Sequence, residues 1–205
     1  MDDDAEPSTR RRSRVRHAAM EEIKGAARQR LELDSTARLS LRSVARDVGL
    51  TPSAIYRYFD SHHALTDALV TDAHESLDAC FRASQQGPSG DACQRWLALY
   101  GAFRTWAREH PAEFALVFGP GAVSSAPAMG VEDLLRATPQ TYAPAGSGVP
   151  VDEDGVPEQA VLLHAWSSVV GFVSLELFGH LAAPDPDALF ARHLDVTLRS
   201  LGLRG

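Results

Sequence analysis

The chain has 205 residues, of which 44% are apolar and 23% charged, a composition typical of a globular protein with a sizeable core. Its two cysteines, Cys80 and Cys93, lack the spacing of a disulfide framework, so we expect a reducing compartment. The acidic run at residues 2–4 stands where a secretory signal needs basic and apolar residues, which argues against secretion.

The formal net charge of −7 is distributed unevenly along the chain. Residues 8–65 contain twelve Lys or Arg and six Asp or Glu, whereas residues 66–205 contain eight and seventeen. A basic N-terminal third therefore precedes an acidic body. This asymmetry predicts that the N-terminal part presents one face to a polyanion such as nucleic acid.

Residues 1–14 lack apolar periodicity, and we predict that they form a disordered arm. This end of the chain is rich in arginine, at Arg10, Arg11, Arg12, Arg14 and Arg16. Two interpretations of the cluster stay open. It is an arm that reaches for DNA phosphates or the minor groove, or it is a solvated tail.

Residues 15–59 have the pattern of a helix-turn-helix domain. A first helix begins at Val15 and carries an apolar stripe formed by Met20, Ile23, Ala27 and Leu31. A second helix is expected over Leu41–Val48, with Ser40 as its N-cap. Gly49 ends it, and Thr51-Pro52 is a strong start signal for a third helix through Phe59. The tight glycine-containing turn between two short helices predicts the motif.

Several residues of the third helix fall outside the expected core, namely Thr51, Ser53, Ala54, Tyr56 and Arg57. In a helix-turn-helix this end of the second motif helix enters the major groove. Ser53 and Ala54 are small enough for the backbone to approach base edges. Thr51 and the free amides of the helix start are suited to phosphate, as is the Tyr56 hydroxyl.

The remainder of the chain is also helical by pattern. Further helices are expected from about Ser61 to Phe81 and over residues 91–110, 111–118, 158–181 and 185–201. Residues 119–157 are rich in Gly and Pro, which predicts loops around one helix near residues 131–136. We therefore predict an all-α fold, with a three-helix domain at residues 15–65 and a larger helical domain at residues 66–205.

Residues 161–181 are apolar on almost every face, but His164, Glu176 and His180 argue against a membrane span. Burial between helices or against a second subunit is the expected alternative. The histidines show no metal-ligand spacing, so we expect no metal, no cofactor and no catalytic residues. Two alternatives to a DNA-binding regulator that responds to a ligand stay open. One is a helical enzyme that transforms small molecules, and the other is an architectural DNA-binding protein without a ligand switch.

The DNA-binding hypothesis gains support from residues 39–65, LSLRSVARDVGLTPSAIYRYFDSHHAL, which resemble the DNA-binding domain of the TetR family of bacterial transcriptional regulators. The resemblance lies in the signature Tyr56, Tyr58, Phe59, Ser61 and Leu65. It implies that Ser40 and Tyr56 contact phosphates and that Arg42 reaches a guanine. Where the family usually has a lysine, this sequence has His62, a weaker phosphate partner. The candidate DNA-binding residues are Ser40, Arg42, Thr51, Pro52, Ser53, Ala54, Tyr56, Arg57 and His62.

The resemblance also implies a role for the second domain. In the family, the last two long helices dimerise, which implies a homodimer through residues 158–181 and 185–201. The stretches YGAFRTWAREHPAEFALVFG and WSSVVGFVSLELFGHL resemble the C-terminal type named for a Trp-His-Gly signature. Trp166 and Gly171 match that signature, but Val170 occupies the histidine position.

The same resemblance implies a small-molecule pocket in the second domain. Its candidate lining residues are Trp96, Tyr100, Phe103, Arg104, Trp106, Phe114, Phe118, Tyr142, His164 and Trp166. Aromatic stripes at helical spacing are also what a plain core needs, so that alternative stays open. The protein so implied is a cytoplasmic bacterial repressor, associated with the nucleoid when bound to DNA. A small apolar or amphipathic effector would release it from an inverted-repeat operator.

Overall fold

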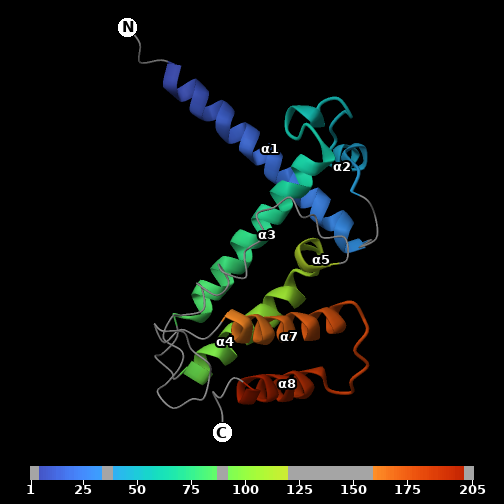
Figure 1. Cartoon of the computed structure of the whole chain (residues 1–205). Coiled ribbons are helices and arrows are strands. Elements are labelled where there is room, and N and C mark those ends of the chain that lie inside the picture. Colours follow the sequence, from blue (N-terminus) through green and yellow to red (C-terminus); the bar gives the residue numbers. More distant parts are fainter. Residues whose placement is uncertain (1–4, 34–38, 87–91, 120–158, 201–205) are drawn as a thin grey trace. The chain divides into compact units, whose positions relative to one another are not determined.

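A computed structural model of the chain describes residues 5–33, 39–86, 92–119 and 159–200 (Figure 1). The regular elements in these ranges are all helices, which confirms the predicted all-α class. In chain order they are α1 Ala5–Leu33, α2 Leu41–Asp47, the 3-10 helix η1 Ile55–Arg57, α3 His62–Ser84, α4 Ala92–Glu109, α5 Pro111–Phe118, α7 Gln159–Leu177 and α8 Pro186–Ser200.

The chain divides into two compact units, residues 1–72 and 73–205. The division falls inside α3, later than the boundary after residue 65 that the sequence suggested. The first turns of α3 belong to the N-terminal unit because Asp72 accepts hydrogen bonds from α1. Lys24 Nζ lies 2.9 Å from Asp72 Oδ1, and the Arg28 guanidinium binds Oδ2. Helix α3 thus contributes residues to both units.

The core of the N-terminal unit contains two of the four residues of the predicted apolar stripe, since Met20 and Leu31 are only half-buried. Helix α1 packs against α2, and Ile23 and Ala27 of α1 are buried, as are Val44 and Ala45 of α2. Ile55 of η1 is fully buried as well. These side chains fill the interior, which leaves the polar residues of the motif at the surface.

The N-terminal arginine cluster is helical rather than disordered. Residues 5–14, which we expected to belong to a disordered arm, form the first turns of α1. Arginine has a high intrinsic helix propensity, and these residues extend a helix already nucleated by the buried stripe from Ile23 onward. Adding turns to an existing helix avoids the nucleation cost that an isolated arm would face.

The sequence predicts a regular third helix over Thr51–Phe59, and this prediction is wrong. This stretch, the recognition segment (residues 51–59), consists of turns at residues 52–54 followed by the three-residue η1. Its backbone bonds are mostly of the i to i+3 kind, such as Ala54 N to Thr51 O at 2.9 Å. The segment is short and rich in β-branched and aromatic residues, which have lower helix propensity than straight side chains.

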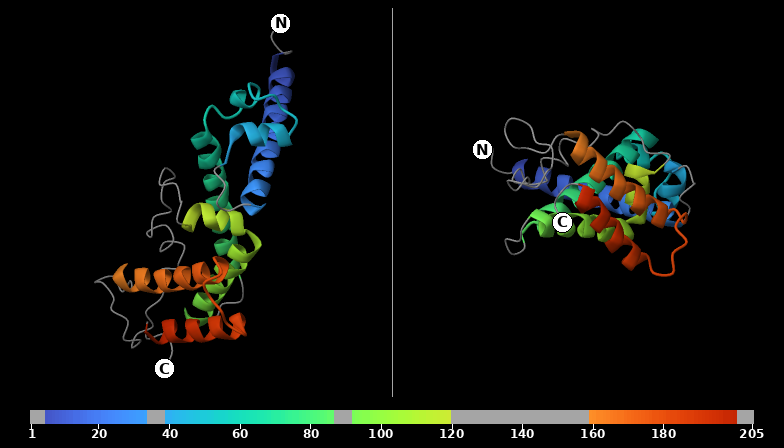
Figure 2. Two further views of the ribbon diagram at one scale, coloured as in Figure 1. Left: turned by 90° about the vertical axis from the view of Figure 1, so that its right-hand side faces the viewer. Right: turned by 60° about the horizontal axis from the view of Figure 1, so that its bottom comes forward.

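The C-terminal unit is built around aromatic side chains from α3, α4, α5 and α7, with Phe190, Leu194 and Leu198 of α8. Helices α7 and α8 run side by side in both views of Figure 2. Helix α5 begins at Pro111 and ends at Phe118, as predicted, because proline is favoured in the first turn. The helix expected near residues 131–136 lies outside the described residues.

Helix α7 ends at Leu177, four residues before the predicted end at Leu181. Gly179 adopts a left-handed φ of 74°, and His180 N donates to Leu175 O at 2.8 Å. This is a glycine C-cap, which closes the last carbonyls of the helix and stops it. Phe178 and Leu181 are apolar because they pack against the core beyond the cap, not because the helix continues through them.

Candidate nucleic-acid interface

The turn of the helix-turn-helix is set by local hydrogen bonds. Gly49 has a φ of 67°, and Leu50 N donates to Ala45 O at 2.8 Å, so α2 ends in a glycine cap. Thr51 then starts the recognition segment, because its Oγ1 accepts a hydrogen bond from Ala54 N at 3.2 Å. The predicted roles of Gly49 as a stop and Thr51 as a cap are both confirmed.

The recognition segment separates buried from exposed side chains cleanly. Ile55 and Phe59 point into the core. Between them, Tyr56 is 49% exposed, an unusual position for a large aromatic ring, and Arg57 is exposed too. An exposed aromatic residue beside an arginine suits phosphate and base contacts better than it suits a core helix.

The other predicted DNA-binding residues lie in the same N-terminal unit. Ser40 is the N-cap residue of α2, but its side chain makes no capping hydrogen bond, and Arg42 lies exposed on the first turn. His62 is half-buried at the first position of α3, with its ring 5.7 Å from that of His63. The remaining candidates in the turn are exposed Pro52 and Ser53 and half-buried Ala54.

Helix α1 holds both motif elements in place by side-chain contacts. Arg30 Nη2 donates to Asp47 Oδ1 at 2.8 Å at the end of α2, and Arg30 Nε binds the other oxygen. The hydrogen bond from Arg30 holds the pKa of Asp47 below its ordinary value. Arg16 Nη1 donates to the backbone carbonyl of Arg57 at 3.0 Å.

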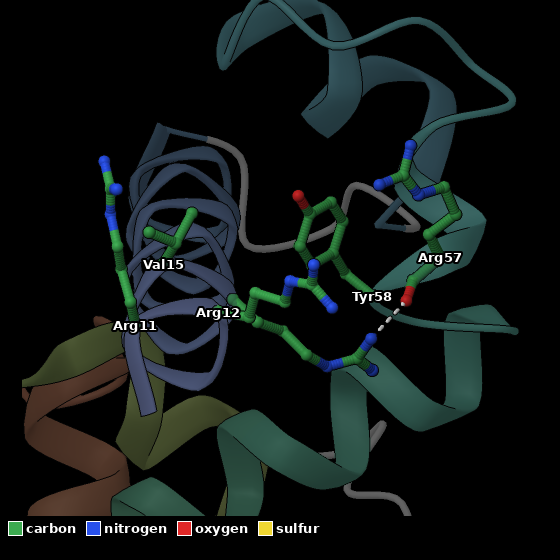
Figure 3. Close-up of a pocket in the computed structure, with 6 residues that line it drawn as sticks. Arg11, Arg12, Val15, Arg57 and Tyr58 are labelled. Atoms are coloured by element: carbon green, nitrogen blue, oxygen red, sulfur yellow. Dashed lines mark hydrogen bonds between the residues drawn. The ribbon is translucent and has the colours of Figure 1, made fainter. Parts of the chain in front are cut away.

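A groove lies between α1 and the recognition segment (Figure 3). It has a volume of about 610 Å³ and is lined by Arg11, Arg12, Val15, Arg16, Arg57 and Tyr58. The guanidinium of Arg16 lies 5.9 Å from the centre of the Tyr58 ring. The sequence left the role of these α1 arginines open and did not place Val15 or Tyr58 at a site. The only signal was the four-residue spacing of Arg12 and Arg16, since both then lie on one face of a helix.

The candidate pocket residues of the C-terminal unit largely come together. The buried aromatic cluster contains Trp96, Tyr100, Phe103, Trp106, Phe114 and Trp166, with Phe118 packed against it. The Phe103 ring centre lies 4.7 Å from that of Trp166 and 5.6 Å from that of Phe118. The rings therefore contact one another directly, and their contact with a ligand remains a prediction.

The polar candidates of this pocket behave differently from the rings. Arg104 is buried but ion-paired with Glu176 and Asp187, so its guanidinium is already engaged. His164 is exposed on α7, away from the buried set. Tyr142 lies outside the described residues. Trp96 Nε1 is buried and has no hydrogen-bond partner in the described part of the chain.

Within the described ranges, no group of His, Cys, Asp and Glu is arranged to hold a metal ion. None of the helices described is long and apolar enough to cross a membrane. Cys80 is a free thiol, with its Sγ 3.5 Å from Ala102 O, and burial raises its pKa and disfavours the reactive thiolate.

Comparisons with known proteins agree with this arrangement. The family described as "Tetracyclin repressor-like, C-terminal domain" matches residues 96–197. The HTH-type transcriptional regulator Rv1816 of Mycobacterium tuberculosis (strain ATCC 25618 / H37Rv) is 31% identical over 198 residues, covering 80% of this chain and 83% of that protein. The chain belongs to the TetR family of transcriptional regulators. The regulator Mb1846 of Mycobacterium bovis is similar to the same extent.

Solved structures of similar proteins place the TetR fold over most of the chain. The regulatory protein SCO4313 has a TM-score of 0.70 and 28% identity, covering 91% of this chain and 98% of that one. A tetR-family regulatory protein from Rhodococcus RHA1 has a TM-score of 0.65, covering 90% and 97%. At 22% identity, that second likeness supports the fold alone.

Family membership and the general function predicted from the sequence are thus confirmed: the protein is a DNA-binding transcriptional regulator. The match of residues 96–197 covers the stretches compared above with the Trp-His-Gly type, but that narrower assignment remains a prediction. The individual DNA contacts of the TetR regulator also remain predictions.

Proposed function

We propose that this TetR regulator is a homodimeric repressor that leaves an inverted-repeat operator when a small apolar or amphipathic ligand binds its C-terminal unit. It acts in the bacterial cytoplasm and on the nucleoid. The observation that carries the DNA-binding part is the exposure of Tyr56 and Arg57 between two buried neighbours, Ile55 and Phe59.

Four of the candidate DNA contacts have a specific chemical role in this proposal. The hydroxyls of Ser40 and Tyr56 donate to phosphate oxygens, which fixes the register of the protein without reading sequence. Arg42 reads a guanine through its two parallel N–H groups. His62 stands where the family usually has a lysine, and its phosphate contact is weaker than that of a lysine ammonium group.

Dimerisation is proposed through α7 and α8. Both helices carry large apolar residues that are exposed, Leu163 and Leu175 on α7 and Leu189 and Val196 on α8. Val196 is 66% exposed. Pairing two copies of this face would bury these residues in an isologous four-helix interface. The dimer would then present two recognition segments to an inverted repeat.

The ligand response is proposed to pass through α3. This helix supplies Leu65 and Leu69 to the N-terminal unit and Leu77 and Phe81 to the C-terminal unit. A ligand that prefers one tilt of α3 would change the spacing of the two recognition segments. Ligand and operator would then oppose each other by one reciprocal coupling energy, typically about 1–3 kcal/mol.

The competing hypotheses differ in what they require. An architectural DNA-binding protein needs no large second domain with an aromatic cluster. An enzyme needs a converging set of reactive groups, and transcriptional regulators of this family are generally not enzymes. We therefore propose no catalytic step and no cofactor.

The proposal is tested by letting the purified protein select duplexes from a random-sequence pool at near-physiological salt. We expect enrichment of one inverted repeat, because specific binding typically exceeds non-specific binding by about 10³–10⁷-fold. Mass spectrometry of the denatured sample identifies any small molecule that is purified with the protein. Salt-sensitive binding without enrichment, from protein free of such a molecule, would favour the architectural hypothesis.

The enriched operator then separates the roles of two residues. Tyr56→Phe should weaken binding to operator and random duplexes by a similar factor, because it removes a phosphate contact. Arg42→Ala should instead relax the preference at one base pair, at a cost of about 1–3 kcal/mol there. Identical effects of both variants on operator and random DNA would contradict this division of roles.

Sedimentation analysis tests the dimer. Val196→Asp places a charge on the exposed apolar face and should shift the protein towards monomer without unfolding it. Thr105→Asp, at an exposed position of α4, is the matched control and should leave the dimer intact. A dimer unchanged by Val196→Asp would exclude this face of α8 from the interface.

A further inference from the structure

The groove between α1 and the recognition segment suggests a contact beyond the helix-turn-helix itself. None of the described residues that line the groove carries a carboxylate. Arg11 and Arg12 are exposed on α1, four residues before Val15 and Arg16 respectively. Two neighbouring rows of one helix therefore face the same space, about 6 Å apart along the axis within each row.

The recognition segment forms the other wall of this groove. Figure 3 shows Arg12 and Val15 of α1 bordering the same space as Tyr58. The hydrogen bond from Arg16 to the Arg57 carbonyl joins the two walls. Arg57 directly follows exposed Tyr56, so the groove opens beside the surface proposed to meet DNA. A polyanion that reaches Tyr56 comes close to the arginines of α1.

Because residues 5–14 are helical, this surface is suited to the phosphate backbone of DNA and not to its minor groove. A helix with side chains is about 10–12 Å wide, whereas the minor groove of B-DNA is only about 6 Å wide. A helical α1 therefore does not enter the minor groove as a flexible arm would. Guanidinium groups on its surface are instead suited to phosphate oxygens, which accept two parallel N–H bonds from one arginine.

We propose that Arg11 and Arg12, with Arg16 as the residue that positions them against the recognition segment, bind the sugar-phosphate backbone of the operator. The groove is a phosphate-binding extension of the helix-turn-helix and carries no sequence preference of its own. This inference rests on the proposed DNA binding. The apolar wall formed by exposed Val15 and the half-buried Tyr58 ring accommodates the sugars between successive phosphates.

The test uses the full-length double variant R11Q/R12Q. Both residues are exposed, and glutamine is a good helix former, so the fold of α1 is retained. The matched control is R82Q/R108Q, which removes the same charge from exposed positions of the C-terminal unit. Circular dichroism of all three proteins checks that helix content is equal.

The first readout is the salt dependence of binding to operator and random duplexes. The slope of log K against log salt should flatten by about 0.9 for each phosphate that the variant no longer neutralises, up to about 3.6 for four arginines in a dimer. The ratio of operator to random affinity should not change. The control should keep the wild-type slope. A double variant with the wild-type slope on both duplexes would overturn the inference.

The second readout locates the contact. Single phosphates of the operator are replaced by uncharged methylphosphonates, and binding to each duplex is measured. We expect a cluster of positions that weakens the wild-type protein but no longer affects R11Q/R12Q. If the effect of the variant instead follows A·T content at one segment, α1 reads the minor groove and the inference is wrong.

The two proposals fail in distinguishable ways. Absence of an enriched operator for the wild-type protein would contradict the proposed function, whereas the slope on random duplexes still tests the groove. An enriched operator with an unchanged slope for R11Q/R12Q would leave the proposed function in place and remove only the groove contact.

Discussion

The guanidinium of Arg104 in α4 binds the carboxylate of Glu176 in α7, 72 residues later in the chain, through two hydrogen bonds. Nε lies 2.8 Å from Oε2 and Nη2 lies 2.7 Å from Oε1. The side chains are only 9% and 13% exposed. The hydrogen bond from Glu176 raises the pKa of Arg104 above its ordinary value. The pair therefore joins two helices of the C-terminal unit inside a poorly hydrated environment.

Removal of one partner of this pair should be costly. Glu176→Gln leaves the buried Arg104 charge with only the exposed Asp187 carboxylate as counter-ion, and breaking such buried pairs typically costs about 3–5 kcal/mol of unfolding free energy. Asp187 also lies 2.8 Å from Arg104 Nη2, but its side chain is 73% exposed. Asp187→Asn should therefore cost less than about 1 kcal/mol.

Urea denaturation of the two variants measures this difference. The double variant Arg104→Met with Glu176→Leu is a further control, because replacing both charges by apolar groups avoids the unpaired charge. We expect it to be more stable than Glu176→Gln. Equal losses for Glu176→Gln and Asp187→Asn would show that burial of the pair does not determine its contribution.

His193 should make the stability of the C-terminal unit depend on pH. Burial lowers the pKa of His193 below its ordinary value near 6.5, although the hydrogen bond to the Ser168 carbonyl at 3.1 Å opposes this shift. The unfolded state therefore binds protons at a higher pH than the folded state. Stability should be fully present above about pH 7 and should fall as the pH decreases through the unfolded value, by at most about 1.4 kcal/mol per pH unit for one proton.

Chemical denaturation between pH 8 and pH 5 checks this direction, and His193→Gln should flatten the curve. His74 has a pKa lowered by burial as well, so part of the dependence should remain. Arg192→Gln, at the neighbouring exposed position, should leave the curve unchanged. A wild-type protein that becomes more stable as the pH falls from 7 to 5 would contradict the prediction.

Two glycines of the N-terminal unit should respond oppositely to the same substitution. Gly49 has a φ of 67°, a conformation that costs an L-residue about 1–2 kcal/mol, so Gly49→Ala should destabilise the protein. Gly25 lies within α1, where an added Cβ meets no atom within 4 Å. Gly25→Ala should stabilise the protein by about 0.5–1 kcal/mol. Thermal unfolding of both variants tests these two expectations. A higher melting temperature for Gly49→Ala would contradict the need for a left-handed residue in this turn.

Asp72 should be important for the first half of α3. Its carboxylate binds both Lys24 and Arg28, and Lys24 is only 8% exposed. Asp72→Asn leaves these charges poorly paired, and we expect a loss of about 1–3 kcal/mol. Glu21→Gln removes the more exposed partner of Lys24 and should cost less than about 1 kcal/mol. Hydrogen exchange measures the effect, and we expect Asp72→Asn to lose amide protection in the first turns of α3. A loss of protection confined to the C-terminal unit would contradict this role of Asp72.

The sequence by itself determined those features whose physical cause is local. The glycine that ends α2, the Thr51 cap and the proline that begins α5 each act through backbone groups within a few residues, so they are readable in the chain. The tyrosine signature, at a fixed spacing from these caps, was enough to identify the family.

Predictions made from local patterns were wrong where two local preferences compete. The recognition segment has a good cap but poor helix formers after it, and it forms only three residues of 3-10 helix. The arginine cluster has no apolar periodicity, yet it continues α1 because the buried stripe further along has already nucleated the helix.

The tertiary structure alone decided which side chains meet. Arg104 binds Glu176, which lies 72 residues later in the chain. Lys24 binds Asp72, 48 residues later, and Arg16 binds the Arg57 carbonyl, 41 residues later. No periodicity encodes such pairs, because they depend on how whole helices pack rather than on the residues between them. For this reason the sequence identified a DNA-binding regulator, whereas the groove beside its recognition segment became visible only in the fold.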